Sequence, residues 1–313
     1  MQLREVKDKI YSVNNIVKIT KALEVVSASK MKKAQSLALN SRPFAREILK
    51  ILKEIKLYQK REERNKNNGL ASYERFFEKK ENTGLKILIV VLTSDKGFCG
   101  SFNSNILKFA LKEIEQLKVK NQIEIFPVGE KAVHFFQEKE YKIRAYFTGI
   151  GDYGTFEEVS PLAIRLFDYY KDKEFDKIII FYNHFISTFY QQPEKVQILP
   201  IEREVIEYLL DRISFKGEEK MEGKDTEKKH FYLIEPEPRL FFDLIIPQLV
   251  EFEIYHLILE ANASEHSARM MAMKNASENS EEILNNLSLE YNKARQSQIT
   301  MELSEITAAK EAL

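Results

Sequence analysis

Glycine is absent from the last part of the chain, and this absence limits what that part can form. Between Pro238 and Leu313 there is no glycine, and one interior proline, Pro247, is expected to kink a helix near its start. Small or apolar residues recur on alternating three- and four-residue steps at Leu287, Tyr291, Ala294, Met301, Ala308 and Ala312, with polar Gln298 and Glu305 between them. The pattern predicts one helix from about Val250, on the order of 95 Å long.

The beginning of the chain has the same character. Residues 2–60 contain no glycine and a single proline, Pro43. The spacing of apolar residues predicts a coiled-coil helix whose seam shifts by one position near Ile16. That seam is expected to run through Leu3, Val6, Ile10, Val13 and Val17, and then through Ile16, Ile19, Leu23 and Val26. Ser41–Lys50 predicts a bend or a restart of the helix.

Between these segments, short β-branched runs alternate with helical ones, which favours a compact α/β domain with a largely parallel sheet. Strands are expected over 85–94, 122–129, 142–149, 176–183 and 231–238, helices over 106–117, 130–139 and 155–170, and an added antiparallel strand over 188–200. A helix of 95 Å cannot be covered by a domain of about 150 residues, whose radius of gyration is only about 15 Å. The terminal helices must therefore pack on each other, and their protruding part is covered by something else or stands in solvent.

The predicted fold class is thus α/β: a Rossmann-like central domain flanked by long N- and C-terminal helices that form an antiparallel coiled coil. We divide the chain into an N-terminal coiled-coil helix (1–60), an α/β domain (85–236) and a C-terminal coiled-coil helix (237–313). Two charged segments, near 60–84 and 202–230, look like insertions.

Charge is unevenly distributed, although the formal net charge of the chain is zero. Residues 1–64 hold 16 Lys and Arg against 7 Asp and Glu. This surplus indicates either a solvated helix face or a long basic surface that meets an acidic partner, nucleic acid or protein.

Three glycines, Gly149, Gly151 and Gly154, have the G-x-G-x-x-G spacing of a dinucleotide-binding turn. Asp152 lies inside the loop, however, where its charge would oppose a pyrophosphate. The loop also follows the third predicted strand rather than the first, and no ribose-binding acid ends the next one. A tight turn between a strand and a helix is therefore the favoured interpretation.

No other pattern predicts catalysis or a metal site. SDKGFCGSFN (94–103) leaves a strand through two glycines but lacks the phosphate-loop lysine, and the lone Cys99 has no base beside it. The five histidines show no metal-ligand spacing. No run of about 18 apolar residues predicts a membrane span, and the start of the chain does not look like a signal or transit peptide. We expect no catalytic, cofactor-binding or metal-binding residues.

Three segments carry a resemblance to a known family. SVNNIVKITKALEVVSASKMKKAQ (12–35) resembles the N-terminal helix of the gamma subunit of the F-type rotary ATP synthase. The C-terminal segment, with SEHSARMMAMKNASENSEEIL and YNKARQSQITMELSEITAAKEAL, is similar to the last helix of that subunit, and SDKGFCGSFN matches a turn of its central domain. The resemblance covers nearly the whole chain apart from the two insertions.

This resemblance implies a non-catalytic rotor shaft that couples proton flow through the membrane ring to ATP synthesis or hydrolysis on the beta subunits. Its partners would be the alpha and beta subunits of the catalytic ring, the epsilon subunit and the membrane c-ring, without nucleic acid and without direct membrane insertion. The implied location is peripheral, on the cytoplasmic face of a bacterial inner membrane. Two alternatives are a nucleotide-binding α/β oxidoreductase and a structural coiled-coil tether.

The resemblance also implies contact residues. Those expected to touch beta are Arg295, Gln296, Thr300, Glu302 and Lys293, together with the basic residues Lys18, Lys21, Lys30, Lys32 and Lys33. Tyr232 and Glu235 would contact epsilon or the c-ring. The chain departs from the family pattern at Leu23 and Val25, where methionines are usual, and at Gly154, where proline is common. Lys310 and Glu311 add charge at the tip, where an apolar bearing is expected.

Overall fold

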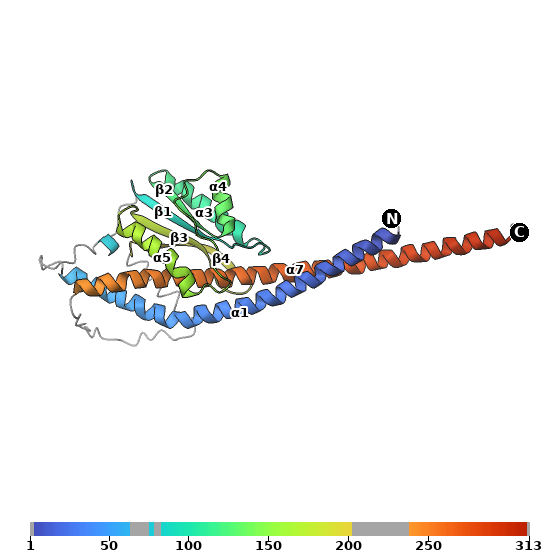
Figure 1. The fold of residues 1–313 in the computed structure, drawn as a ribbon, viewed down its shortest axis with the longest axis horizontal. Coiled ribbons are helices and arrows are strands. Elements are labelled where there is room, and N and C mark those ends of the chain that lie inside the picture. Colours follow the sequence, from blue (N-terminus) through green and yellow to red (C-terminus); the bar gives the residue numbers. More distant parts are fainter. Residues whose placement is uncertain (1–2, 63–74, 78–82, 202–237, 312–313) are drawn as a thin grey trace.

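The computed structural model describes residues 3–62, 75–77, 83–201 and 238–311. Two helices dominate it: α1 spans Leu3–Glu62 and α7 spans Pro238–Glu311, 60 and 74 residues respectively. They lie side by side and antiparallel, and both leave the sheet in the same direction (Figure 1). At 1.5 Å per residue α7 is about 110 Å long, which confirms the predicted shaft-like helix. The helix does not restart over Ser41–Lys50, because α1 continues through Pro43 without interruption, and the alternative of a bend there stays a prediction.

The edge of α1 that packs on α7 keeps a regular heptad spacing, so the predicted shift of the seam is also wrong. The buried or half-buried positions with this spacing are Leu3, Val6, Ile10, Val13, Val17, Thr20, Glu24, Ser27, Met31 and Ala34. Leu23, which belongs to the predicted second seam, is also half-buried. Ile16, Ile19 and Val26 are instead about half exposed or more. The Thr20 hydroxyl donates to the carbonyl oxygen of Ile16 at 2.9 Å, so its burial leaves no unpaired polar group. The position of α7, rather than the apolar character of single residues, decides which edge of α1 is buried.

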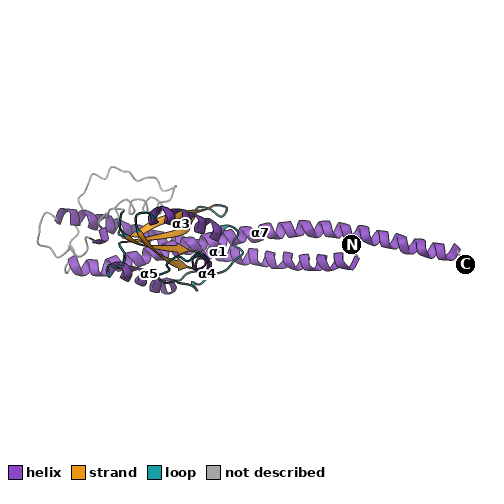
Figure 2. Cartoon of the chain, turned by 90° about the horizontal axis from the view of Figure 1, so that it is seen from above, coloured by secondary structure: helices purple, strands orange, loops and turns teal. Residues whose placement is uncertain are grey.

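On α7 the matching edge loses its cover toward the C-terminus. Leu287, Tyr291 and Ala294 are half-buried, whereas Met301 is 64% exposed. Beyond the start of α1 the helix α7 extends alone (Figure 2). The heptad pattern therefore continues past the point where this chain supplies a partner.

A four-stranded sheet in the order β2-β1-β3-β4 forms the centre of the α/β domain. Strands β1 (Lys86–Leu92), β2 (Gln122–Val128) and β3 (Lys177–Phe185) are parallel, and β4 (Gln191–Leu199) pairs antiparallel with β3. This confirms the predicted largely parallel sheet with its added antiparallel strand.

Helices cover both faces of the sheet (Figure 1). On one face Ile87, Ile89 and Val91 of β1 pack with α3 (Phe102–Lys118) and α4 (Glu130–Glu138). On the other face the alternate residues of β1 pack with α5 (Phe156–Lys171) and with the first half of α7. The first part of α7 is thus a core helix of the α/β domain, and its later part belongs to the coiled coil.

One predicted strand did not form. Residues 142–149 run beside β2 but make only isolated bridges, Ile125 with Ile143 and Val128 with Phe147. Pro127 lies between these bridges and lacks the N–H that a continuous ladder needs at this edge. The strand predicted over 231–238 and the insertion near 202–230 lie outside the described residues, apart from Pro238 at the start of α7.

Candidate functional site

Carboxylates of this chain bind the backbone N–H groups in and beside the glycine loop Gly149–Gly154. The Asp95 carboxylate accepts hydrogen bonds from the backbone N–H of Gly149 and of Glu130, each at 3.0 Å. Glu130 is the first residue of α4, so Asp95 occupies the place where an anion would bind the N-terminus of that helix. These bonds use N–H groups that a pyrophosphate would need.

The helix that follows the loop is closed in the same way. Thr155 caps α5: its hydroxyl accepts from the Glu158 N–H, and the Glu158 carboxylate accepts from the Thr155 N–H. This capping box satisfies two N–H groups of the first turn. Gly154 stands before it with a φ of +55°, and a Cβ there would lie 2.9 Å from Nδ2 of Asn262. The geometry agrees with the interpretation of the trio as a turn.

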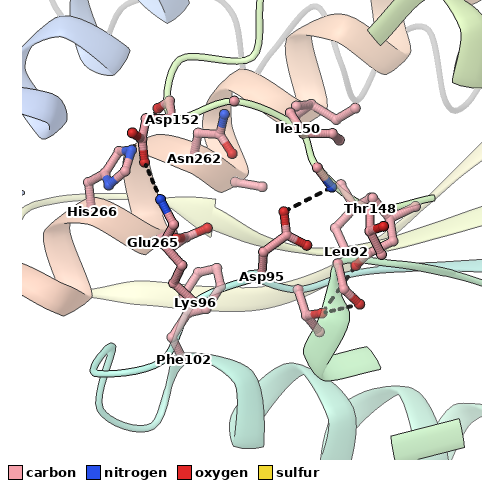
Figure 3. Close-up of a pocket in the computed structure, with 17 residues that line it drawn as sticks. Leu92, Asp95, Lys96, Phe102, Thr148, Ile150, Asp152, Asn262, Glu265 and His266 are labelled. Carbon is pink, nitrogen blue, oxygen red and sulfur yellow. Dashed lines mark hydrogen bonds and ion pairs between the residues drawn. The ribbon is translucent and has the colours of Figure 1, made fainter. Parts of the chain in front are cut away.

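Beside this loop lies a cavity of about 270 Å³ at the carboxyl end of the parallel strands (Figure 3). The residues after β1, the glycine loop and helix α7 line it. Asp152 and His266 form one side, and Asp95 lies across from them. The charged groups around it have partners: Asp95 accepts from backbone N–H groups, Lys96 pairs with Asp152, and Glu265 pairs with Arg269.

Asp152 is the centre of this polar cluster. Its Oδ2 accepts from Nζ of Lys30 on α1 at 2.6 Å, and Nζ of Lys96 lies 3.7 Å from its Oδ1. The hydrogen bond from Lys30 is the largest cause that lowers the pKa of Asp152 below its ordinary value. The carbonyl oxygen of Asp152 binds Nε2 of His266 on α7, at 2.7 Å.

The tautomer of His266 follows from its neighbours. Arg269 has only donors, and its Nη1 lies 3.3 Å from Nδ1 of His266, so Nδ1 must accept. Nε2 therefore carries the hydrogen and donates to the Asp152 carbonyl. Burial is the main cause that lowers the pKa of His266 below 6.5. The ring is thus a neutral link between α7 and the glycine loop.

A pH dependence of stability follows from His266. Because its pKa is lower in the folded chain than in the unfolded chain, the unfolded state binds more protons as the pH falls through the unfolded value near 6.5. We expect the free energy of unfolding to decrease from pH 7.5 to pH 5, and His266→Gln to remove part of that decrease. Urea titrations across this range measure it. His134→Gln, at an exposed ring, is the control; equal slopes for both variants would contradict the assignment.

The basic residues of α1 fall into different environments. Lys18 and Lys32 are exposed, and Lys21 binds Glu24 of the same helix at 3.0 Å. Lys30 is bound to Asp152, and Nζ of Lys33 lies 4.0 Å from the centre of the Tyr153 ring. Of the five lysines, the structure thus brings Lys30 and Lys33 together on the glycine loop. The contacts with beta stay predictions for all five.

The predicted contact residues near the C-terminus all lie on the last part of α7. Lys293, Arg295 and Gln296 are exposed, as are Thr300 and Glu302. The Thr300 hydroxyl donates to the Gln296 carbonyl oxygen within the helix, at 2.9 Å, and Glu302 accepts from the side chain of Gln298 at 3.0 Å. Tyr232 and Glu235 lie outside the described residues.

Sequence reasoning missed the partners of Asp152. The loop acid was noticed only as an obstacle to phosphate, and neither His266 nor Arg269 was singled out. The Arg269 guanidinium binds the carbonyl oxygens of Gly97 and Lys96, so α7 also holds the loop after β1. The residues involved are far apart in the chain, and their spacing carries no local pattern.

Within the described residues, no group of three or more His, Cys, Asp or Glu side chains is placed to hold a metal ion. No helix in the same part of the chain is long and apolar enough to cross a membrane.

Known proteins match this chain over nearly its whole length. The sequence profile of the family described as ATP synthase matches residues 2–313. The ATP synthase gamma chain of Histophilus somni (strain 2336) is 36% identical over 312 residues, covering 99% of each chain. The gamma chain of Nitrosomonas europaea is 35% identical over 311 residues, again with 99% of each covered.

Solved structures agree on the fold. A chain of the Euglena gracilis mitochondrial ATP synthase, solved as OSCP/F1/c-ring, superposes with a TM-score of 0.62 at 17% identity, covering 99% of this chain and 94% of that one. A chain of the Tetrahymena thermophila mitochondrial ATP synthase central stalk and c-ring gives 0.56 at 24% identity, covering 83% and 99%. The chain has two long helices around a four-stranded domain, and it is 35–36% identical to gamma chains over 99% of its length. It therefore belongs to the gamma-chain family of ATP synthase.

Proposed function

We propose that this chain is the rotating central shaft that couples proton flow through a membrane ring to ATP synthesis or hydrolysis on partner subunits. The observation that carries the proposal is the far end of α7, where Met301, Leu303 and Ile306 are each at least 60% exposed. These apolar side chains lie on the end of α7, which extends beyond the N-terminal end of α1 (Figure 1). Large exposed apolar surfaces mark interaction sites. A surrounding ring of alpha and beta subunits would cover this one.

The surface of the shaft suits rotation inside such a ring. The exposed apolar residues are distributed along α1 and α7 among charged ones, including Lys18 and Arg295, rather than gathered in one deep docking site. Exposed charge pairs contribute about 0–1 kcal/mol each, so contacts of this kind can be exchanged at little cost. Lys293, Arg295 and Gln296, with Thr300 and Glu302, are the proposed contacts with beta near the tip.

Catalysis is assigned to the partners. The glycine loop and the helix N-termini beside it are closed by Asp95 and by the Thr155 capping box, so the α/β domain offers no free phosphate cradle there. We place the α/β domain, with epsilon and the c-ring, at the foot of the complex on the cytoplasmic face of a bacterial membrane. Tyr232 and Glu235 are the proposed contacts at that end.

The stoichiometry of the assembled complex tests this proposal. Co-expression of a tagged chain with alpha and beta subunits is expected to yield a complex with one copy of this chain per six ring subunits, because one shaft fills one ring. Native mass spectrometry of the purified complex measures it. Recovery of self-associated chains without ring subunits would instead support a structural tether, and tight nucleotide binding by the chain alone would support an oxidoreductase.

A further inference from the structure

Among the side chains that the structure describes, helix α1 contacts both α7 and the glycine loop of the α/β domain. Most of its buried edge packs along α7 (Figure 1). Near the middle of α1, a second connection reaches the glycine loop of the α/β domain through Lys30 and Lys33. At this level the seam with α7 buries Ser27, Met31 and Ala34. The lysine contacts lie outside that seam and tie the same stretch of α1 to a second element, the glycine loop.

Two neighbouring residues of the loop bind two lysines on one face of α1. Nζ of Lys30 donates to the Asp152 carboxylate at 2.6 Å, and both side chains are about one-third exposed or less, at 27% and 33%. One turn further along α1, Nζ of Lys33 lies over the ring of Tyr153, 4.0 Å from its centre. Residues three positions apart share a helix face, so the two contacts act on the same side of α1.

The loop is held from its other side by α7. His266 donates to the carbonyl oxygen of Asp152 at 2.7 Å, and Arg269 binds the carbonyl oxygens of Gly97 and Lys96 in the loop after β1. Asp152 thus binds α1 through its side chain and α7 through its backbone. Figure 3 shows Asp152 beside His266, with the side chain of Lys96 approaching the Asp152 carboxylate. One residue therefore connects both long helices with the α/β domain.

We infer that Asp152 is a positioning residue that fixes α1 to the α/β domain, so that the coiled coil and the domain turn as one body. The inference rests on the proposed function for its rotational meaning, but the mechanical connection itself is a property of the isolated chain. An ion pair that is still partly exposed contributes little to the global stability of a protein. Its loss should therefore change local opening of α1 rather than global unfolding.

Hydrogen exchange of the full chain tests the connection. Asp152→Asn and Lys30→Gln are each expected to speed amide exchange in residues 27–35 by about threefold, without changing exchange in β1. The double variant should be no faster than either single one, because both remove the same bond. Lys30→Arg, which keeps the charge, should exchange like the unmodified chain. Additive effects, or unchanged exchange in Asp152→Asn, would overturn the inference.

Asp168→Asn is the matched control, since it removes the same charge from an exposed position on α5. It is expected to leave the exchange of residues 27–35 unchanged. If it accelerates that exchange as much as Asp152→Asn does, the effect is one of net charge and the inference fails.

The assembled complex tests the role in coupling. In membrane vesicles, Asp152→Asn and Lys30→Gln should pump fewer protons per ATP hydrolysed, by a similar factor, and the double variant should show no further loss. Unchanged pumping in variants with faster exchange would overturn the positioning role. If the unmodified chain fails to assemble or to couple, the proposed function fails, and the exchange experiment still decides whether Asp152 holds α1.

Discussion

Gly129→Ala is expected to destabilise the α/β domain by about 4 kcal/mol, which is a large part of the 5–15 kcal/mol that stabilises a typical protein. Gly129 joins β2 to α4 with a φ of +91°, and a Cβ there would lie 2.2 Å from the carbonyl oxygen of Thr93. Thr93 cannot easily retreat. Its N–H donates to the Val128 carbonyl, and its hydroxyl accepts from the N–H of Ala132 at 2.9 Å.

Urea denaturation of the full chain, followed by circular dichroism, measures this loss. Substitutions at two other glycines distinguish the cost of the positive φ from the cost of the clash with Thr93. Gly149 also has a positive φ, of +81°, but a Cβ would meet nothing within 4 Å, so Gly149→Ala should cost only about 1 kcal/mol. Gly97 has neither constraint, and Gly97→Ala should change stability by less than about 0.5 kcal/mol. If Gly129→Ala costs no more than Gly149→Ala, the close approach of Thr93 is not what makes glycine necessary.

Replacing Arg295 and Gln296 together with alanine is expected to lower ATP turnover of the assembled complex by about tenfold. Both side chains are exposed on the free end of α7 and make no contribution to the packing of this chain. A hydrogen bond to a charged group is worth about 1.5–3 kcal/mol, and a barrier raised by 1.4 kcal/mol slows a reaction about tenfold. Steady-state hydrolysis by the purified complex measures the effect.

The control is Lys274→Ala with Asn279→Ala, which removes one positive charge and one amide-bearing side chain from exposed positions nearer the α/β domain on the same helix. We expect this pair to leave turnover within about twofold. Circular dichroism and subunit composition should match the unmodified complex for both double variants. Equal turnover of the Arg295 and Gln296 variant and the unmodified complex would remove these residues from the proposed contact with beta.

The long helices could be predicted from the sequence because their determinants are local. The absence of glycine and the three- and four-residue spacing of apolar residues indicate a helix wherever they occur. Helices α1 and α7 accordingly begin and end within two or three residues of the predicted bounds. The strands β1 and β3 were equally clear, since a buried parallel strand is a continuous β-branched run. The strand predicted over 142–149 failed because it depended on Pro127 of a neighbouring strand.

The buried edge of α1 could not be predicted fully from local sequence. Apolar Ile16, Ile19 and Val26 were assigned to the buried edge, yet Thr20 and Ser27 are buried instead. A helix can bury only one narrow edge against one partner, and that edge is fixed by where α7 lies. The apolar residues left outside are part of the surface that we propose the catalytic ring covers.

The sequence by itself determined the helical ends, the α/β domain between them and, through its motifs, the family. It also indicated that the glycine loop is a turn, because the negative charge of Asp152 inside the loop would oppose a phosphate. Only the tertiary structure decided what Asp152 does, since Lys30 on α1 and His266 on α7 lie more than 100 residues away on either side of it. Periodicity is a property of neighbours along the chain, whereas an ion pair between distant segments exists only once the helices have packed.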